Sequence, residues 1–102
     1  MKSPTIGLIQ KIIKGDGITK ENVDDFCADL ENALCREYRS LFERQPAFAE
    51  RLNDDVLDIC EEVEMGYDPQ VFGRKLGEAY DRALTLIDQK GAPLEPEEET
   101  QQ

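Results

Sequence analysis

The sequence predicts an all-α fold, a small irregular antiparallel four-helix bundle. Apolar residues recur at intervals of three and four along four successive stretches of the chain, which places them on one face of a helix. Proline and glycine mark the boundaries between these stretches, and no stretch shows the alternation of a half-buried strand. Amphipathic helices joined by short connections bury their apolar faces by packing against one another, so a bundle follows.

The first helix is predicted to begin at Pro4, with Ser3 as its N-cap. It ends at 15–17, a Gly-Asp-Gly turn in which glycine supplies the left-handed closing residue. This turn lacks the further oxygen ligands of a calcium loop. The first helix is shorter than the others, which makes the bundle irregular. Its apolar residues are Ile6, Leu8, Ile9, Ile12 and Ile13.

The second helix is predicted to be capped by Thr19 and to run to about Arg44. It ends before Pro46, because the residue preceding a proline avoids helical geometry. Glu37 lies at the margin of the apolar face, where we expect it to pair with an arginine. The apolar face consists of Val23, Phe26, Cys27, Leu30, Ala33, Leu34, Tyr38 and Leu41.

The third helix is predicted to open at Pro46 and to end at Gly66. Asp68 then caps the fourth helix, and Pro69 occupies its first turn. The third apolar face consists of Phe48, Leu52, Val56, Ile59, Cys60 and Val63, and the fourth of Phe72, Leu76, Ala79, Tyr80, Ala83, Leu84 and Ile87.

The end of the chain differs in composition from the rest. Gly91 and Pro93 are predicted to close the fourth helix, and the residues after them are acidic with little to bury. We therefore divide the chain into a helical domain, residues 1–91, and an acidic tail, residues 92–102, which we expect to be disordered.

The overall composition excludes several functions. The chain has 102 residues, 12 basic and 23 acidic, with a net charge of −11 and no histidine. Catalytic sites and zinc sites that use imidazole are therefore excluded. A strongly negative protein repels nucleic acids and acidic membranes. No apolar run approaches the ~20 residues of a membrane span, and the N-terminus does not resemble a signal peptide.

The three cysteines, Cys27, Cys35 and Cys60, do not form a disulfide framework, because their number is odd and small. Two of them lie among apolar residues, where thiols act as small hydrophobic groups. We therefore expect a reduced protein in the cytoplasm.

The negative charge is concentrated in residues 46–68, which contain one basic and eight acidic residues, a net charge of −7. At about 100° per residue, Asp54, Asp58 and Glu61 fall opposite the apolar face of the third helix. Like charges at this spacing repel one another, which suggests that the repulsion serves a purpose. Leu57 and Met65 lie within this charged face and have the character of interface anchors.

Three other interpretations of the acidic face remain open. It can be a solvated surface without a partner, as most runs of charge are. It can offer carboxylate oxygens to Mg²⁺ or Ca²⁺, although helix-bundle metal sites point their carboxylates inward and add histidine. It can hold a catalytic acid and base, although such pairs need a pocket that separates their pKa values. We predict no catalytic residue, no metal site and no cofactor.

Residues 8–26 (LIQKIIKGDGITKENVDDF) resemble the opening of colicin-D-type bacterial immunity proteins, the self-protective colicin-like family that includes immunity proteins of contact-dependent inhibition systems. The acidic third helix followed by Tyr67-Asp68-Pro69 is similar to that family as well. The chain departs from the pattern at Gly17, an extra residue in the turn, and at Val23, where an aromatic residue is common.

The resemblance implies a helical antitoxin that covers the basic cleft of a cognate nuclease toxin, often a tRNase, with carboxylates that mimic RNA phosphates. It thus implies a protein partner and no direct contact with nucleic acid or membrane. An acidic helical adaptor or regulator and a DNA-mimic protein are the alternatives. The expected toxin-binding residues are Asp54, Asp55, Leu57, Asp58, Glu61, Glu62, Glu64, Met65, Tyr67 and Asp68.

Overall fold

The computed structural model describes residues 2–15, 17–64, 66, 68–88 and 95–96. Within this part of the chain the fold is all-α, as predicted, apart from one pair of two-residue strands. In chain order the elements are β1 (Lys2–Ser3), α1 (Pro4–Lys14), α2 (Val23–Arg44), α3 (Pro46–Glu64), α4 (Pro69–Leu84) and β2 (Glu95–Pro96).

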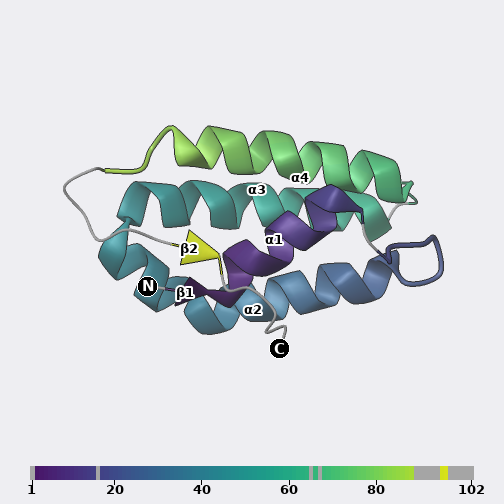
Figure 1. The fold of residues 1–102 in the computed structure, drawn as a ribbon, viewed down its shortest axis with the longest axis horizontal. Helices are drawn as coiled ribbons and strands as arrows, with labels where there is room; N and C mark the ends of the chain where they lie inside the picture. Colours follow the sequence, from purple (N-terminus) through teal and green to yellow (C-terminus); the bar gives the residue numbers. More distant parts are fainter. Residues whose placement is uncertain (1, 16, 65, 67, 89–94, 97–102) are drawn as a thin grey trace, which may run out of the picture.

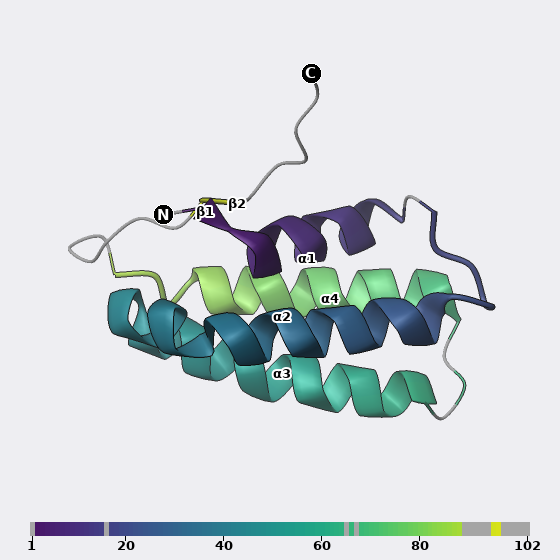
Figure 2. The same cartoon turned by 90° about the horizontal axis from the view of Figure 1, so that it is seen from below.

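The three longer helices form the body of the bundle, and the short helix crosses them. Helices α2, α3 and α4 follow one another antiparallel, and α1 runs obliquely across them, packed against both α2 and α4 (Figure 1). The second view places α1 on one side of the bundle and α3 on the opposite side (Figure 2). Among the described helices, α3 therefore packs against α2 and α4 only, and its face away from α1 has no helix beside it.

The core matches the predicted apolar faces closely. Phe48, Phe72, Leu30 and Leu76 are completely buried, and all six predicted residues of the third helix are buried. Two predicted core residues are wrong. Ile13 and Leu84 remain 40% and 42% exposed, since Ile13 lines an open groove between α1 and α4 and Leu84 is the last residue of α4.

The starts of α1 and α4 confirm the predicted caps. The Ser3 hydroxyl accepts a hydrogen bond from the Ile6 amide at 3.1 Å, and an Asp68 carboxylate oxygen accepts one from the Gln70 amide at 2.8 Å. Gly15 ends α1 with a φ of 76°, a left-handed conformation that glycine adopts without strain.

The predicted cap of α2 is one turn too early. The Thr19 amide donates to the Asn22 side chain at 2.7 Å, and the Asn22 amide donates to the Thr19 hydroxyl at 3.3 Å. This reciprocal exchange holds a hydrogen-bonded turn that leads into α2, since the Val23 amide donates to the Thr19 carbonyl at 3.0 Å, and α2 itself begins at Val23. The side chains of Thr19 and Asn22 therefore satisfy each other's backbone amides instead of the first free amides of the helix.

Helix α4 is also shorter than predicted. It ends at Leu84, where the Thr85 hydroxyl donates to the Arg82 carbonyl at 2.6 Å. The buried Gln45 side chain then exchanges two hydrogen bonds with the backbone of Asp88, of 3.0 and 2.8 Å. These bonds draw the chain toward the turn between α2 and α3. The predicted closing residues, Gly91 and Pro93, lie outside the described residues.

The described part of the tail lies beside the start of the chain. Strand β2 pairs in parallel with β1, with Lys2 opposite Glu95 and Ser3 opposite Pro96. The two strands lie next to the first turn of α1 (Figure 1). The remaining tail residues, for which disorder was predicted, lie outside the described part of the chain.

Candidate functional site

The uncovered face of α3 carries a row of exposed acidic side chains. Glu50, Asp54 and Asp58 follow one another at intervals of four residues, and Glu61 comes three residues later. All four are exposed, and none forms an ion pair with another described residue. The row extends about 16 Å along a rigid helix at 1.5 Å per residue. We call Glu50, Asp54, Leu57, Asp58 and Glu61 the α3 ridge.

Leu57 is the apolar member of the α3 ridge. It is 48% exposed, the largest value among the exposed large hydrophobic residues in the described part of the chain. It follows Asp54 by three residues and precedes Glu61 by four, so it shares their face of the helix. Covering an exposed apolar side chain removes its surface from water, which is favourable in free energy, and most favourable when the covering surface is apolar as well.

Two predicted site residues do not belong to this free surface. Oδ2 of Asp55 lies 3.1 Å from Nε of Arg51 and 3.6 Å from Nη2 of Arg82, and the side chain is only 16% exposed. Oε1 of Glu62 lies 3.3 Å from Nζ of Lys75. Asp55 and Glu62 therefore join α3 to α4, and their charges are largely balanced within the bundle.

The remaining predicted site residues, Glu64, Met65, Tyr67 and Asp68, come at or just after the end of α3 in the sequence. Asp68 is exposed, but its side chain is occupied as the cap of α4. Glu64 is the last residue of α3. Met65, the second predicted anchor, and Tyr67 lie outside the described residues. The ridge thus retains Asp54, Leu57, Asp58 and Glu61 of the predicted set and adds Glu50, which was not among the predicted residues.

Glu37 has a different role from the predicted one. It is buried, 8% exposed, and no arginine pairs with it in the described part of the chain. Its Oε1 accepts hydrogen bonds from the Ser3 hydroxyl at 2.8 Å and from the Thr5 amide at 3.1 Å. The partner of Glu37 is therefore the start of α1 and not an arginine. Free amides and the helix dipole favour a negative charge there.

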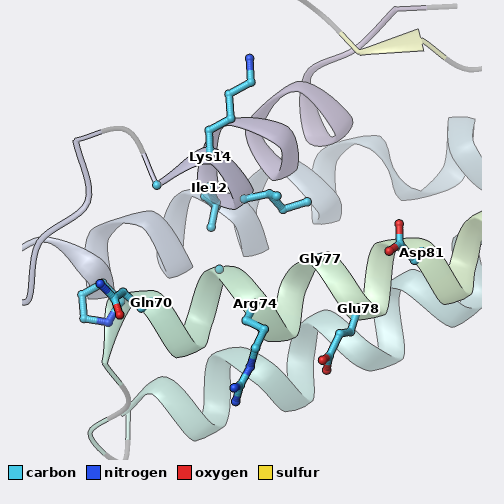
Figure 3. A pocket seen from close by; sticks show the side chains of 11 residues that line it. Ile12, Lys14, Gln70, Arg74, Gly77, Glu78 and Asp81 are labelled. Carbon is cyan, nitrogen blue, oxygen red and sulfur yellow. The ribbon is translucent and has the colours of Figure 1, made fainter.

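A groove of about 500 Å³ lies between α1 and α4. Ile12 and Ile13 of α1 form one wall, and Gly73 and Gly77 lie on the α4 side. The charged side chains around it do not converge. Lys14 points away from α4, while Arg74 and Glu78 point toward α3 (Figure 3). The groove therefore does not bring an acid and a base to one point.

Helix α1 approaches α4 closely at this groove. A Cβ atom added at Gly73 would lie 3.3 Å from the Ile12 carbonyl oxygen, and one added at Gly77 would lie 3.8 Å from the Ile13 side chain. The two glycines are four residues apart, so they lie on one face of α4. They allow α1 to cross that face at short range.

Beside this crossing, Tyr80 is half-buried in the bundle. Burial raises the pKa of the Tyr80 phenol above its ordinary value of 10.0, and the nearby charge of Asp81 raises it further. A hydrogen bond with Gln10 partly opposes the rise in pKa. The phenol therefore keeps its proton at neutral pH and serves packing, edge-on to the Phe48 ring at 6.4 Å between ring centroids.

Neither a metal site nor a membrane span is present among the described residues. They contain no group of three or more cysteine or acidic side chains placed to hold a metal ion. They contain no helix that is both long and apolar enough to cross a bilayer. In comparisons with known proteins, no family model, no curated protein and no solved structure matches the chain.

Proposed function

We propose that this protein is an immunity protein, a non-enzymatic antitoxin that binds and blocks the basic active-site cleft of a cognate bacterial nuclease toxin. The observation that carries the proposal is the α3 ridge. Its four carboxylates lack partners within the described bundle, and they surround an exposed leucine on a rigid helix.

The chemistry of the partner follows from the charge of the ridge. A nuclease that cleaves RNA holds the phosphate backbone of its substrate with lysine and arginine. A row of carboxylates at helical spacing presents negative charge to such a cleft, as phosphates do. Unlike RNA, it contains no phosphodiester bond for the nuclease to cleave. Long-range attraction between the ridge and the cleft accelerates association and is weakened by salt. A cytoplasmic tRNase is the target that fits best, because the antitoxin must act where tRNA lies.

The lifetime of the complex depends on the apolar part of the ridge. Contacts that are desolvated at the centre of an interface slow dissociation, whereas charges at its rim mainly affect association. Leu57 occupies the central position, between Asp54 and Glu61. We expect it to enter an apolar cavity of the toxin and to dominate the dissociation rate.

The ion pairs on α3 exclude two acidic residues from the surface that we propose contacts the toxin. Asp55 and Glu62 act inside the bundle, so they stabilise the helix that presents the ridge and do not contact the toxin. Glu50 joins the contact set because it is exposed and in line with Asp54. The resemblance of residues 8–26 to colicin-D-type immunity proteins supports the same function independently of the charge.

Co-expression tests the proposal. The protein is produced together with the product of the adjacent open reading frame, which the proposal expects to contain a nuclease domain, and cell growth and intact tRNA are measured. The wild-type chain should protect, and the double variant Asp58→Lys/Glu61→Lys should not. Protection by both chains would reject the α3 ridge as the binding surface. Displacement of the chain from a host protein by duplex DNA, but not by tRNA, would favour a DNA mimic instead.

A further inference from the structure

Between Asp25 and Arg39 the outer face of α2 carries charges that are separated by sign along the helix, and the exposed Glu43 follows Arg39 on the same face. Asp25 and Asp29 lie in its first half, and Arg36 and Arg39 lie in its second half. All four residues are exposed. In Figure 2 α2 runs along the bundle in front of α4, and no other helix crosses it there.

Among the described residues, only Arg39 of these four has an ion-pair partner, Glu43 on the same helix. The neighbours of Asp29 at helical spacing on this face are Asp25 and Asn32, and those of Arg36 are Asn32 and Arg39. Asp25, Asp29 and Arg36 form no ion pair with another described residue. Arg39 lies 3.6 Å from Glu43, but the Arg39 side chain is 92% exposed, which marks a weak pair.

The helix dipole does not account for this arrangement. A dipole favours acidic residues in the first turn of a helix and basic residues in the last turn, and its effect fades beyond them. Asp29, Arg36 and Arg39 all lie outside the first and last turns of the helix Val23–Arg44. Instead, each half of the face holds two like charges at helical spacing, which repel each other.

A second copy of the same face, turned antiparallel, places opposite charges across from both like-charged pairs and so offsets their repulsion. Asp29 lies three residues before Asn32 and Arg36 four residues after it, while Asp25 and Arg39 lie seven residues on either side. A two-fold axis near Asn32 therefore sets each aspartate opposite an arginine of the second copy. We propose that α2 binds a second copy of this chain, antiparallel and through this face.

The centre of the face suits a close approach of two helices. Ala28 and Asn32 have short side chains and lie between the charged pairs. The distance between packed helices depends on the side chains at their contact, and short ones allow them to approach. A two-fold interface presents the same patch on both copies, so every favourable pair occurs twice. None of the residues that make this contact belongs to the α3 ridge, and the inference does not depend on the proposed toxin.

Exchanging charges between two chains tests the dimer directly. The variants Asp29→Arg and Arg36→Asp are studied by sedimentation equilibrium, each alone and as an equimolar mixture, at physiological ionic strength. Wild-type chains should reach twice the single-chain mass of 11.6 kDa as their concentration rises. Each variant alone should associate at least about tenfold more weakly than wild type, because like charges then face each other. The mixture should form a heterodimer, since all its pairs are opposite.

A matched pair of variants controls for net charge. Glu78→Arg and Arg74→Asp make the same changes of charge at exposed positions of α4, four residues apart. Their mixture should associate no more than wild type. The proposal is overturned if the α2 mixture sediments as single chains, or if the α4 mixture associates equally well. Circular dichroism of every variant establishes that the helices are intact.

Discussion

The Ser3 hydroxyl donates a hydrogen bond of 2.8 Å to the buried carboxylate of Glu37, thirty-four residues further along the chain. The same hydroxyl accepts the Ile6 amide at 3.1 Å, and the carboxylate also accepts the Thr5 amide at 3.1 Å. The first turn of α1 and the middle of α2 are thus joined by one buried network, and α1 is held where it crosses the bundle.

Replacing Ser3 should therefore lower the free energy of unfolding by more than replacing an ordinary cap residue does. Ser3→Ala removes the cap of α1 and one of the two donors to a buried charge, so we expect a loss of about 2 kcal/mol in the free energy of unfolding. Asp68→Ala, which removes an exposed cap of α4, should cost about 1 kcal/mol. Urea unfolding of both variants measures the difference. An equal loss in both would mean that the contact with Glu37 contributes nothing.

The two glycines of α4 should respond differently to alanine. Gly77→Ala meets only the flexible Ile13 side chain at an ordinary distance, and should stabilise by up to about 1 kcal/mol through helix propensity. Gly73→Ala brings Cβ within 3.3 Å of the Ile12 carbonyl oxygen, so part or all of that gain should be lost. Thermal unfolding of the two variants ranks them. A higher midpoint for Gly73→Ala would argue against the close crossing of α1 and α4.

Neighbouring aspartates on α3 should have opposite effects on stability. Asp55→Asn weakens two ion pairs at a side chain that is 16% exposed, and we expect it to cost about 0.5–1 kcal/mol. Asp54→Asn relieves repulsion along the ridge and should be neutral or slightly stabilising. Urea unfolding at low and high salt measures both, and the effect of each should shrink as salt screens the charges. Equal destabilisation by the two changes would contradict the division of α3 into a paired side and a free ridge.

Tyr80 should make stability depend on alkaline pH. Because burial raises the pKa of Tyr80 in the folded protein, the folded state retains its proton where the unfolded chain loses it. The stabilisation is fully present below the ordinary pKa of 10.0 and is lost as pH rises through the folded pKa. Urea unfolding at several alkaline pH values should show a flatter decline for Tyr80→Phe than for wild type. Identical declines would show that the phenol titrates normally.

The local features of the fold were predictable because each depends on a few adjacent residues. A serine before a proline defines the start of α1, and helical periodicity alone identified the buried face of α3. Thr19 misled the prediction by one turn: it exchanges hydrogen bonds with Asn22 as a helix cap does, but α2 begins only at Val23. Helix α4 ends early because the side chain of Gln45, far away in the sequence, forms hydrogen bonds with the backbone of Asp88.

The candidate site was only partly predictable for a related reason. The wheel of the third helix correctly places Asp54, Asp58 and Glu61 on the outer face. It does not reveal which acids at the sides face a neighbouring helix, because Arg82 and Lys75 reach Asp55 and Glu62 from α4. The spacing of Arg51 and Asp55, four residues apart, was the one local signal of that pairing.

The central claim is that the α3 ridge, rather than negative charge in general, recognises a cationic nuclease. Stopped-flow association with the purified nuclease domain tests it with two variants of equal charge, Asp58→Lys/Glu61→Lys on the ridge and Glu78→Lys/Asp81→Lys on α4. We predict that the ridge variant associates about tenfold or more slowly and that the α4 variant stays near wild type at moderate salt. Equal rates for the two variants would contradict the claim.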